Sequence, residues 1–429
     1  MVIQRDAYLN KLIRKKNNGL IKVITGLRRC GKSYLLFHQF YDYLIQCGIH
    51  PENIIALSLD DDENASLRNP DELSAYLKSS IKSKDESYYV LLDEAQFAIT
   101  EQEKKGQEPI RLYGILNGLL SKGNVDVYVT GSNSKFLSSE FMTEFRGRGD
   151  EVKIYPLTFK EFCSAYPDKD VLEAWGEYSR YGGMPYLLSL QNDEDKEDYL
   201  DHLVNLTYIK DVVERYHLRG DVVLDALFSI LSSSIGSLTN PTKLANTFKS
   251  HQIHTSDITI SKEIGYLIDA FIISKAERYD IKGKRYIDSP YKYYFSDIGL
   301  RNSQLHYRQQ EQTHIMENII YNELVVRGFN VDVGVVERAE KGSDGRQKNL
   351  RREVDFVCNK GSDRYYIQSA YTLADEEKRK NELKALDSID DSFRKIIVTQ
   401  DFAKPWKTDK GYLVIHLFDF LLDENALNR

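Results

Sequence analysis

Short apolar runs and amphipathic stretches alternate through the first 160 residues. The runs that predict strands are Leu20–Thr25, Ile54–Leu59, Tyr88–Leu92, Val125–Thr130 and Glu151–Leu157. The stretches that predict helices include Tyr34–Phe40, Pro70–Ser83 and Arg111–Ser121. The run Tyr88–Leu92 is apolar without alternation, which is typical of a strand covered on both faces of a parallel sheet. The pattern therefore predicts an α/β domain.

After residue 160 the pattern changes. Helical spacing dominates 161–215, and we expect a helical lid that ends in an exit helix, Asp198–Tyr216. Further helices are predicted at Val222–Ile235, Thr239–Ser250, Thr259–Ala270 and Ile315–Arg327. Further strands are predicted at Ile272–Tyr279, Lys284–Ile287, Glu353–Val357 and Tyr365–Ala370. We expect four domains with the boundaries 1–160, 161–218, 219–305 and 306–429.

Composition narrows the class of protein. A chain of 429 residues is too long for one ordinary core. No apolar run approaches the roughly 20 residues of a membrane span, and the first residues lack the apolar core of a signal peptide. The four cysteines, Cys30, Cys47, Cys163 and Cys358, form no C-x-x-C pair, which argues against zinc and disulfides. We expect a soluble cytoplasmic protein with no membrane partner. Its net charge of −7 gives no overall attraction to nucleic acid.

The first predicted strand leads into the strongest motif. Gly26-Leu27-Arg28-Arg29-Cys30-Gly31-Lys32-Ser33 has the G-x-x-x-x-G-K-S spacing of a phosphate-binding P-loop between a strand and a helix. The glycines let the backbone curl so that several N–H groups face one anion, and the helix N-terminus adds its dipole. The residues expected to bind ATP here are Gly26, Arg28, Arg29, Cys30, Gly31, Lys32, Ser33 and Tyr34. Lys32 would reach the β- and γ-phosphates, and the Ser33 hydroxyl would ligate Mg²⁺.

A second motif follows the strand at Tyr88–Leu92. The pair Asp93-Glu94 places two carboxylates at the end of an apolar strand, as a Walker B motif does. Ligands bind at the carboxyl ends of strands in such sheets. Asp93 would hold Mg²⁺, and Glu94 would act as the general base that orients water. An isolated Asp-Glu could equally begin a plain loop; the P-loop upstream favours the catalytic reading.

Two weaker signals follow. Ser132 and Asn133 come directly after the strand Val125–Thr130 and could touch the γ-phosphate or the water, although Thr-Gly-Ser-Asn is also ordinary turn chemistry. Arg146 and Arg148 precede the last strand of the first domain and suit an arginine finger, often supplied across a subunit boundary. A basic surface turn is the alternative. The finger reading allows a homo-oligomer.

Several segments resemble one family. They are Gly26–Ser33, Leu91–Glu94, Thr130–Ser134, Arg146–Arg148, Tyr155–Phe162 and Tyr181–Pro185. In this order they are similar to the prokaryotic AAA-type ATPases that carry a C-terminal nuclease-like domain of unknown function, relatives of archaeal and STAND-type signalling ATPases. The resemblance implies an ATP- and Mg²⁺-dependent ATPase. It also implies that Gly183 and Pro185 form a turn near the adenine of ATP or ADP; a loop between two lid helices is the alternative.

Residues 219–305 predict a winged helix, with three helices and a hairpin. The hairpin carries Arg278, Lys282, Lys284, Arg285 and Tyr286, a basic and aromatic cluster that could touch DNA phosphates. The expected recognition helix is poor in arginine and contains Glu263 and Asp269. A protein-contact role therefore stays open beside a DNA-binding role.

Residues 306–429 resemble a PD-(D/E)xK nuclease, a restriction-endonuclease-like α/β fold. The resemblance places Glu317, Asp355 and position 368 as Mg²⁺ ligands, with a lysine at position 370. Here those last two positions are Gln368 and Ala370. An amide is a poor Mg²⁺ ligand and alanine has no proton chemistry, so we expect a catalytically degenerate domain. A migrated lysine, Lys378, is the alternative.

Three functions are consistent with these motifs. The first is an ATPase whose nucleotide state controls the winged-helix and nuclease-like domains on DNA or a protein partner. The second is an ATP-regulated DNA-processing nuclease, which Ala370 disfavours. The third is a nucleotide-gated switch with little turnover, which Glu94 disfavours.

Overall fold

The computed structural model describes residues 3–131, 147–218, 220, 222–308, 310–341 and 347–429. The chain divides into two compact units, where the sequence analysis expects four domains. Unit 1 comprises Met1–Pro156 and Asp269–Phe271, and unit 2 comprises Leu157–Ile268 and Ile272–Arg429. Each unit is described by itself below.

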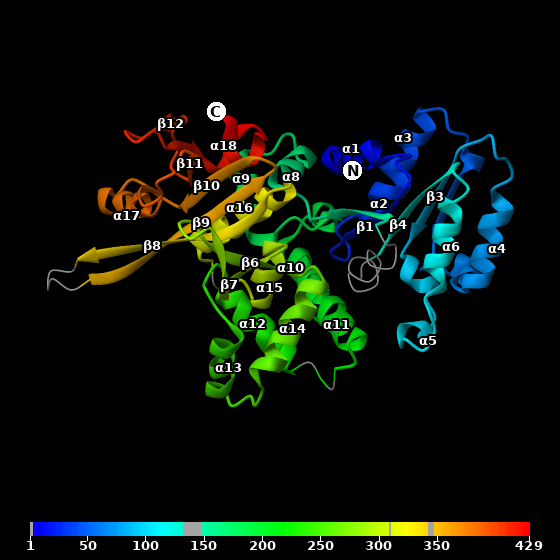
Figure 1. Cartoon of the computed structure of the whole chain (residues 1–429), viewed down its shortest axis with the longest axis horizontal. Helices are drawn as coiled ribbons and strands as arrows, with labels where there is room; N and C mark the ends of the chain where they lie inside the picture. The colour runs from blue at the N-terminus through cyan, green and yellow to red at the C-terminus, as the bar shows by residue number, and fades with distance from the viewer. Residues whose placement is uncertain (1–2, 132–146, 219, 221, 309, 342–346) are drawn as a thin grey trace. The chain divides into compact units, whose positions relative to one another are not determined.

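Unit 1 is built on a parallel sheet, drawn in blue and cyan in Figure 1. Its described strands are β1 (Ile21–Gly26), β2 (Ile54–Ser58), β3 (Tyr88–Asp93), β4 (Val125–Thr130) and β5 (Gly149–Ile154). Their order is β2-β3-β4-β1-β5, and every pairing is parallel. Strands β1, β3 and β4 are buried along their whole length, which confirms the prediction made for the run Tyr88–Leu92 in β3.

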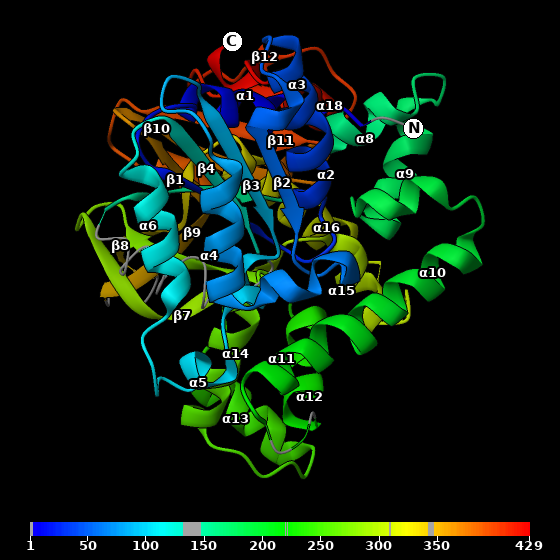
Figure 2. The same ribbon diagram turned by 90° about the vertical axis from the view of Figure 1, so that its right-hand side faces the viewer.

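Helices cover both faces of this sheet. The described helices of unit 1 are α1 (Asp6–Lys15), α2 (Lys32–Tyr34), α3 (Tyr41–Gln46), α4 (Pro70–Ser80), α5 (Glu101–Lys104) and α6 (Arg111–Leu120). A π-helical turn, Leu35–Phe40, joins α2 to α3. Helices α4 and α6, visible in front of the strands in Figure 2, pack through Leu73, Leu77, Leu112 and Leu116 against one face. Phe40 packs against Tyr128, with ring centroids 4.5 Å apart, on the other face.

The predicted elements of unit 1 are confirmed with small shifts at their ends. The last strand begins two residues before its expected start, at Gly149, and stops at Ile154. Helix α4 stops at Ser80.

Unit 2 contains a mixed sheet whose described strands have the order β12-β13-β11-β10-β9-β8-β6-β7. They are β6 (Ile273–Asp280), β7 (Arg285–Phe295), β8 (Asn330–Lys341), β9 (Gln347–Lys360), β10 (Asp363–Ala370), β11 (Arg394–Thr399), β12 (Trp406–Lys407) and β13 (Leu413–His416). Its helices are α8 (Phe159–Ala165), α9 (Val171–Tyr181), α10 (Asp193–His202), α11 (Lys210–Arg215), α12 (Val222–Ser233), α13 (Pro241–Ser250), α14 (Asp257–Asp269), α15 (Ile298–Gln304), α16 (Gln312–Val326), α17 (Glu376–Asp387) and α18 (Leu417–Leu422).

One continuous sheet crosses the domain boundary expected at 305/306. The predicted winged-helix hairpin is β6–β7, and β6 pairs in parallel with β8 through Arg278↔Val333 and Asp280↔Val335. The three helices and the hairpin exist, but the hairpin is part of the same sheet as the predicted nuclease-like strands. Strand β7 also runs eight residues beyond Ile287, the end that the sequence predicts, to Phe295.

A register shift lies at the centre of this sheet. Strands β8 and β9 pair as Asp332↔Val357 and then as Gly334↔Val354, so an irregularity separates the two pairs. As a result Val354 and Val357 both pack in the apolar cluster that includes Leu386 of α17. Asp355 lies between these two valines, at the position where the strand is re-aimed.

Candidate functional site

The loop after β1 has the backbone that the motif predicts. Gly26 has φ 140° and Gly31 has φ 97°. A Cβ added at Gly26 would lie 2.1 Å from the carbonyl oxygen of Ile154, so β5 leaves space only for glycine. Gly31 stands directly before Lys32, the first residue of α2. The amino end of that helix is therefore joined to the strand by a tight turn.

Lys32 lies buried over this loop. Its exposed fraction is 4%, and its Nζ donates to the carbonyl oxygens of Gly26 at 3.2 Å and Leu27 at 3.0 Å. Burial raises the pKa of Asp93, the last residue of β3, and the Ser33 side chain lies close enough to that carboxyl to oppose the rise. The two motifs, 60 residues apart in the sequence, therefore lie close together.

The other loop residues have different surroundings. Arg28 and Arg29 are exposed, and Arg29 adopts φ 65°. Cys30 is buried with its Sγ 3.6 Å from the carbonyl oxygen of Ile154, so its side chain packs against β5. Tyr34 is half-buried beside the ring of His38, with centroids 4.8 Å apart. The nucleotide contacts expected of these residues stay predictions.

Asp93 and Glu94 are held by Thr130, the last residue of β4. The Thr130 hydroxyl donates to Asp93 Oδ1, and the Glu94 N–H donates to Thr130 Oγ1 at 3.1 Å. Burial raises the pKa of Asp93, while hydrogen bonds from Thr130 and Ser33 oppose the rise. Glu94 has φ 49°, and its carboxylate accepts from the Gln96 amide. The geometry supports a held carboxylate pair at the carboxyl edge of the sheet.

Sequence reasoning missed Thr130 and Arg5. Thr130 could have been found as the last strand residue before Gly131, because the expected sensor positions come just after it. Arg5 is 2% exposed; its Nη1 donates to the carbonyl oxygen of Cys30 at 2.8 Å and its Nη2 to that of Tyr155 at 2.7 Å. It therefore fastens the loop to the end of β5. No local pattern marks Arg5, because its acceptors are far along the chain.

Of the expected sensor and finger residues, Ser132, Asn133 and Arg146 lie outside the described residues. Arg148 is exposed, and its carbonyl oxygen accepts from the Ile21 N–H at 2.8 Å. Ile21 begins β1 and Gly26 ends it, which separates the two ends by about 16 Å at the usual rise per residue. Arg148 therefore lies at the amino edge of the sheet, opposite the P-loop of its own chain.

Gly183 and Pro185 belong to unit 2, where packing explains the glycines. The Gly183 N–H donates to Asp297 Oδ2 at 2.7 Å, and its carbonyl oxygen accepts from the Leu157 N–H at 2.8 Å. A Cβ at Gly183 would lie 2.2 Å from the carbonyl oxygen of Leu157. Pro185 begins a short helical turn. The predicted role of this turn near adenine stays a prediction.

The predicted nuclease residues Glu317 and Asp355 do come together, around a lysine that sequence reasoning missed. Lys292 Nζ of β7 lies 2.9 Å from Glu317 Oε1, 2.7 Å from Glu353 Oε1 and 3.8 Å from Asp355 Oδ1. We call Lys292, Glu317, Glu353 and Asp355 the carboxylate–lysine cluster. Burial opposes the charge on Lys292, but the carboxylates outweigh burial, so the pKa of Lys292 is raised.

Gln368 lies beside this cluster and not among its charges. Its Oε1 accepts from the Asp355 N–H at 3.3 Å, and its Nε2 donates to Glu382 Oε2 at 2.9 Å. Within the described parts of the chain, no group of three or more His, Cys, Asp or Glu side chains is arranged to hold a metal ion. The alternative lysine, Lys378, has a side chain outside the described part of the structure.

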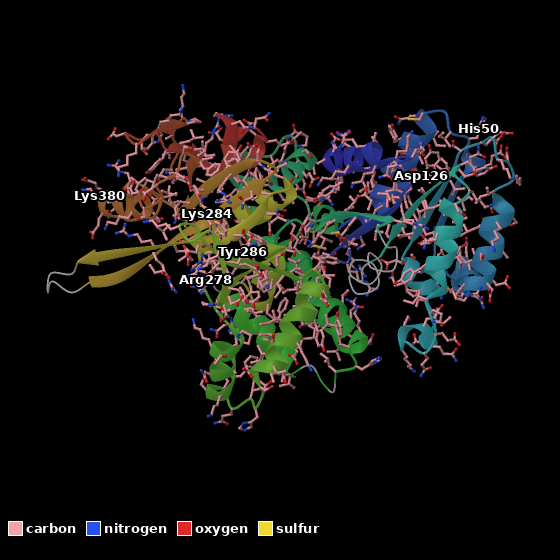
Figure 3. All side chains as sticks on the ribbon, in the orientation of Figure 1. His50, Asp126, Arg278, Lys284, Tyr286 and Lys380 are labelled. Atoms are coloured by element: carbon pink, nitrogen blue, oxygen red, sulfur yellow. The ribbon has the colours of Figure 1, made fainter. Side chains whose placement is uncertain are left out.

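The basic cluster predicted on the hairpin is only partly on the surface. Arg278 is 3% exposed, and its Nη2 donates to the carbonyl oxygen of Ser289 at 2.6 Å, so it does not reach a phosphate. The expectation that Arg278 touches DNA is therefore wrong. Lys284 and Tyr286, labelled in Figure 3, remain exposed. Tyr286 donates to Asp332 Oδ2 at 3.2 Å.

Comparisons with known proteins agree with unit 1. A family described as "AAA domain" matches residues 18–163. A "Domain of unknown function (DUF8612)" matches residues 172–311. The AAA part of the resemblance is therefore confirmed, while its winged-helix and nuclease-like parts stay predictions. Among the described residues, no helix has both the length and the apolar character needed to cross a membrane.

Solved structures offer only distant likenesses. A Walker-type ATPase of Pyrococcus abyssi shares 14% identity at a TM-score of 0.47, over 71% of this chain and 96% of that one. Cdc6p of Pyrobaculum aerophilum shares 11% identity at a TM-score of 0.30, over 74% and 96%. Likenesses at this level carry no argument about function.

Two whole-length relatives are closer in sequence. An uncharacterized protein of Methanocaldococcus jannaschii is 29% identical over 438 residues, 96% of this chain and 89% of that protein. An uncharacterized protein of Haemophilus influenzae is 34% identical over 425 residues, 98% of this chain and 99% of that protein. This chain therefore belongs to the same protein family as the Haemophilus influenzae protein, with an AAA domain at residues 18–163.

Proposed function

We propose that unit 1 binds ATP with Mg²⁺ and hydrolyses it. The observation that carries the proposal is the proximity of the two motifs: Ser33 lies beside Asp93, and Thr130 hydrogen-bonds both Asp93 and Glu94. In this proposal the turn would bind phosphate, the Ser33 and Asp93 oxygens would ligate Mg²⁺ and the Glu94 carboxylate would orient water, all at one edge of a parallel sheet.

Each residue has a distinct part in this proposal. Lys32 would exchange its contacts with the loop carbonyls for the β- and γ-phosphates, which its buried position favours. Ser33 and Asp93 offer the hydroxyl and carboxylate oxygens that Mg²⁺ prefers. When bound, Mg²⁺ would neutralise charge on the phosphates. Glu94 would orient the attacking water and accept its proton. Ser132 and Asn133 would contact the γ-phosphate or the water.

The arginine of this site would come from a second copy of the chain. Arg148 lies at the amino edge of its own sheet, so it cannot approach the phosphates of its own P-loop. A finger at Arg148 would therefore act across a subunit boundary in a homo-oligomer, and Arg146 is the other candidate finger.

We propose that the nucleotide state of unit 1 controls three parts of unit 2. They are a helical lid (161–218), a winged helix (219–305) and a nuclease-like part (306–429). Lys284 and Tyr286 are exposed and could contact the phosphate backbone of a nucleic acid. Arg278 and Glu263 are buried, which disfavours sequence-specific contacts between the winged helix and DNA bases. The partner is DNA or a protein. A nucleotide-gated switch with little ATP turnover is the second candidate function. The presence of Glu94, the proposed general base, disfavours it.

A binding and turnover assay on the full-length protein tests the proposal. Lys32→Ala should lose binding of a fluorescent ATP analogue. Glu94→Gln should bind it but lose at least about 100-fold in turnover. Lys78→Ala and Glu72→Gln, both on the exposed side of α4, are matched controls that should keep parent activity. Parent turnover in Glu94→Gln would exclude Glu94 as the base, and intact affinity in Lys32→Ala would refute the phosphate site.

The same assay separates the candidate partners. ATP turnover is measured alone and with duplex DNA, single-stranded DNA and RNA. Stimulation by one nucleic acid identifies the partner class. No turnover under any condition would favour the switch.

A further inference from the structure

A lysine occupies the centre of the carboxylate–lysine cluster, the place where the nuclease resemblance would put a metal ion. Lys292 is 3% exposed, and its ammonium contacts carboxylates from two other elements, α16 and β9. A buried cation of this kind persists only where opposite charges compensate its lost hydration. Three carboxylates around one ammonium satisfy that condition.

The oxygens that a metal would need are already engaged. Glu317 Oε1 accepts from Lys292 and also from the Tyr294 hydroxyl at 2.7 Å. Asp355 Oδ2 accepts from the Ser369 N–H at 2.9 Å, while Oδ1 faces Lys292. A divalent ion placed among these oxygens would have to displace the ammonium and overcome its positive charge.

The neighbouring residues do not supply a replacement. Position 368 offers an amide, whose oxygen bonds the Asp355 backbone, and position 370 is alanine. The residues present therefore do not fit the metal that the nuclease resemblance implies.

We infer that the Lys292 ammonium is the resident cation of this cluster, standing in place of a divalent metal and joining β7, α16 and β9. The cluster then binds no divalent ion in the native chain. Removing the lysine, while keeping the three carboxylates, opens a divalent-cation site.

Mn²⁺ alone, added to the full-length protein without nucleotide and counted by electron paramagnetic resonance, tests this inference. Lys292→Gln should bind one more Mn²⁺ per chain than the parent, because three neighbouring carboxylates lose their counter-charge. The double variant Lys292→Gln, Asp355→Asn should lose that ion again. Lys275→Gln is the matched control, since it removes an exposed lysine paired with Glu277 on the adjacent strand β6. Absence of the extra ion in folded Lys292→Gln would overturn the inference.

A second comparison does not depend on how Lys292→Gln folds. The parent and Asp355→Asn, both with Lys292, should bind equal numbers of Mn²⁺ and should leave plasmid DNA intact. If Asp355→Asn loses an ion that the parent binds, or abolishes cleavage of DNA by the parent, a metal enters the cluster beside Lys292 and the inference fails. Any Mn²⁺ bound by Ser33 and Asp93 is present in both proteins of each comparison and cancels in the difference in bound Mn²⁺. The result is therefore independent of the proposed ATPase.

Discussion

At the scale of single residues, Thr130 shows how one hydroxyl can organise a site. It donates to Asp93 and accepts from the Glu94 N–H. We expect Thr130→Val, which keeps the shape but removes the hydroxyl, to lower ATP turnover about 10- to 100-fold, the usual effect of losing a group that orients a metal ligand. Steady-state phosphate release measures this.

Thr130→Ser is the control, because it retains the hydroxyl and should stay close to the parent rate. Equal turnover by Thr130→Val and the parent would show that the hydroxyl does not position Asp93 and Glu94.

Glu263 of α14 gives a pH-dependent prediction. Burial raises its pKa to about 7 from an ordinary 4.5, and its Oε2 has no hydrogen-bond partner among the described residues. The folded state therefore holds a proton that the unfolded chain has released, so this contribution to stability is full below pH 4.5 and is lost as the pH rises through 7. Glu263→Gln cannot ionise. Between about pH 5 and pH 8 the free energy of unfolding of the parent should fall by on the order of 2 kcal/mol relative to that of the variant.

Urea unfolding followed by tryptophan fluorescence measures this difference. The chain has two tryptophans, Trp175 and Trp406, and both belong to unit 2, as Glu263 does. If the urea midpoint of unfolding changes equally in the parent and in Glu263→Gln between the two pH values, Glu263 is not the titrating group.

The sequence predicts some residues of the site and not others for a physical reason. Lys32, Ser33, Asp93 and Glu94 lie in short motifs, where spacing alone encodes the geometry. Arg5 and Lys292 act on partners that other elements bring to them, Tyr155 and Glu317 among them. Spacing along the chain carries no record of such contacts, so a lone buried arginine or lysine looks like a surface residue.

At the scale of elements, periodicity predicts most helices and strands within a few residues, because burial of one face or both dictates the apolar pattern. Strand β7 exceeded its predicted length. Its second half contains Pro290, Lys292 and several tyrosines, a composition that does not predict a buried strand. The strand can be buried because Lys292 is paired with carboxylates from other elements. The pairing of β6 with β8 could not be predicted, because register depends on partners distant in the chain.

The glycines around α9 permit a paired test. A Cβ at Gly182, where φ is 78°, would lie 2.1 Å from Asp297 Oδ1. Gly182→Ala should therefore cost on the order of 2–3 kcal/mol in unfolding free energy, through backbone strain and a displaced carboxylate. Urea unfolding followed by far-UV circular dichroism measures this cost.

Gly176 is the matched control within the same helix. It is exposed in the middle of α9, and an added Cβ meets nothing within 4 Å. Gly176→Ala should gain about 0.5–1 kcal/mol through helix propensity. A neutral effect of Gly182→Ala would mean that the turn at 182–183 adapts to a side chain.

At the scale of the whole molecule, the position of Arg148 makes a prediction about assembly. If Arg148 completes the site of a neighbouring copy, Glu94→Gln and Arg148→Ala are each inactive but defective in opposite halves of a shared site. Mixing them should restore part of the parent turnover, because some interfaces then combine an intact Glu94 with an intact Arg148.

The control mixture is Glu94→Gln with Lys32→Ala. Both changes lie in the same half of the site, so no interface in the mixture is fully intact and activity should stay absent. Recovery of activity in this control would mean that the recovery in the first mixture does not report a shared site. No recovery of activity in the first mixture would exclude Arg148 as a finger supplied in trans.

The direct pairing of β6 with β8 limits where this protein can be divided into fragments. The match to the domain of unknown function ends at residue 311, between the two strands. A gene fragment ending there would present the unpaired edge of β6 to solvent, and the complementary fragment would present that of β8. Exposed edges of this kind pair with other chains and aggregate. Recombination or protein engineering that exchanges the C-terminal part must therefore transfer the sheet from β6 onward.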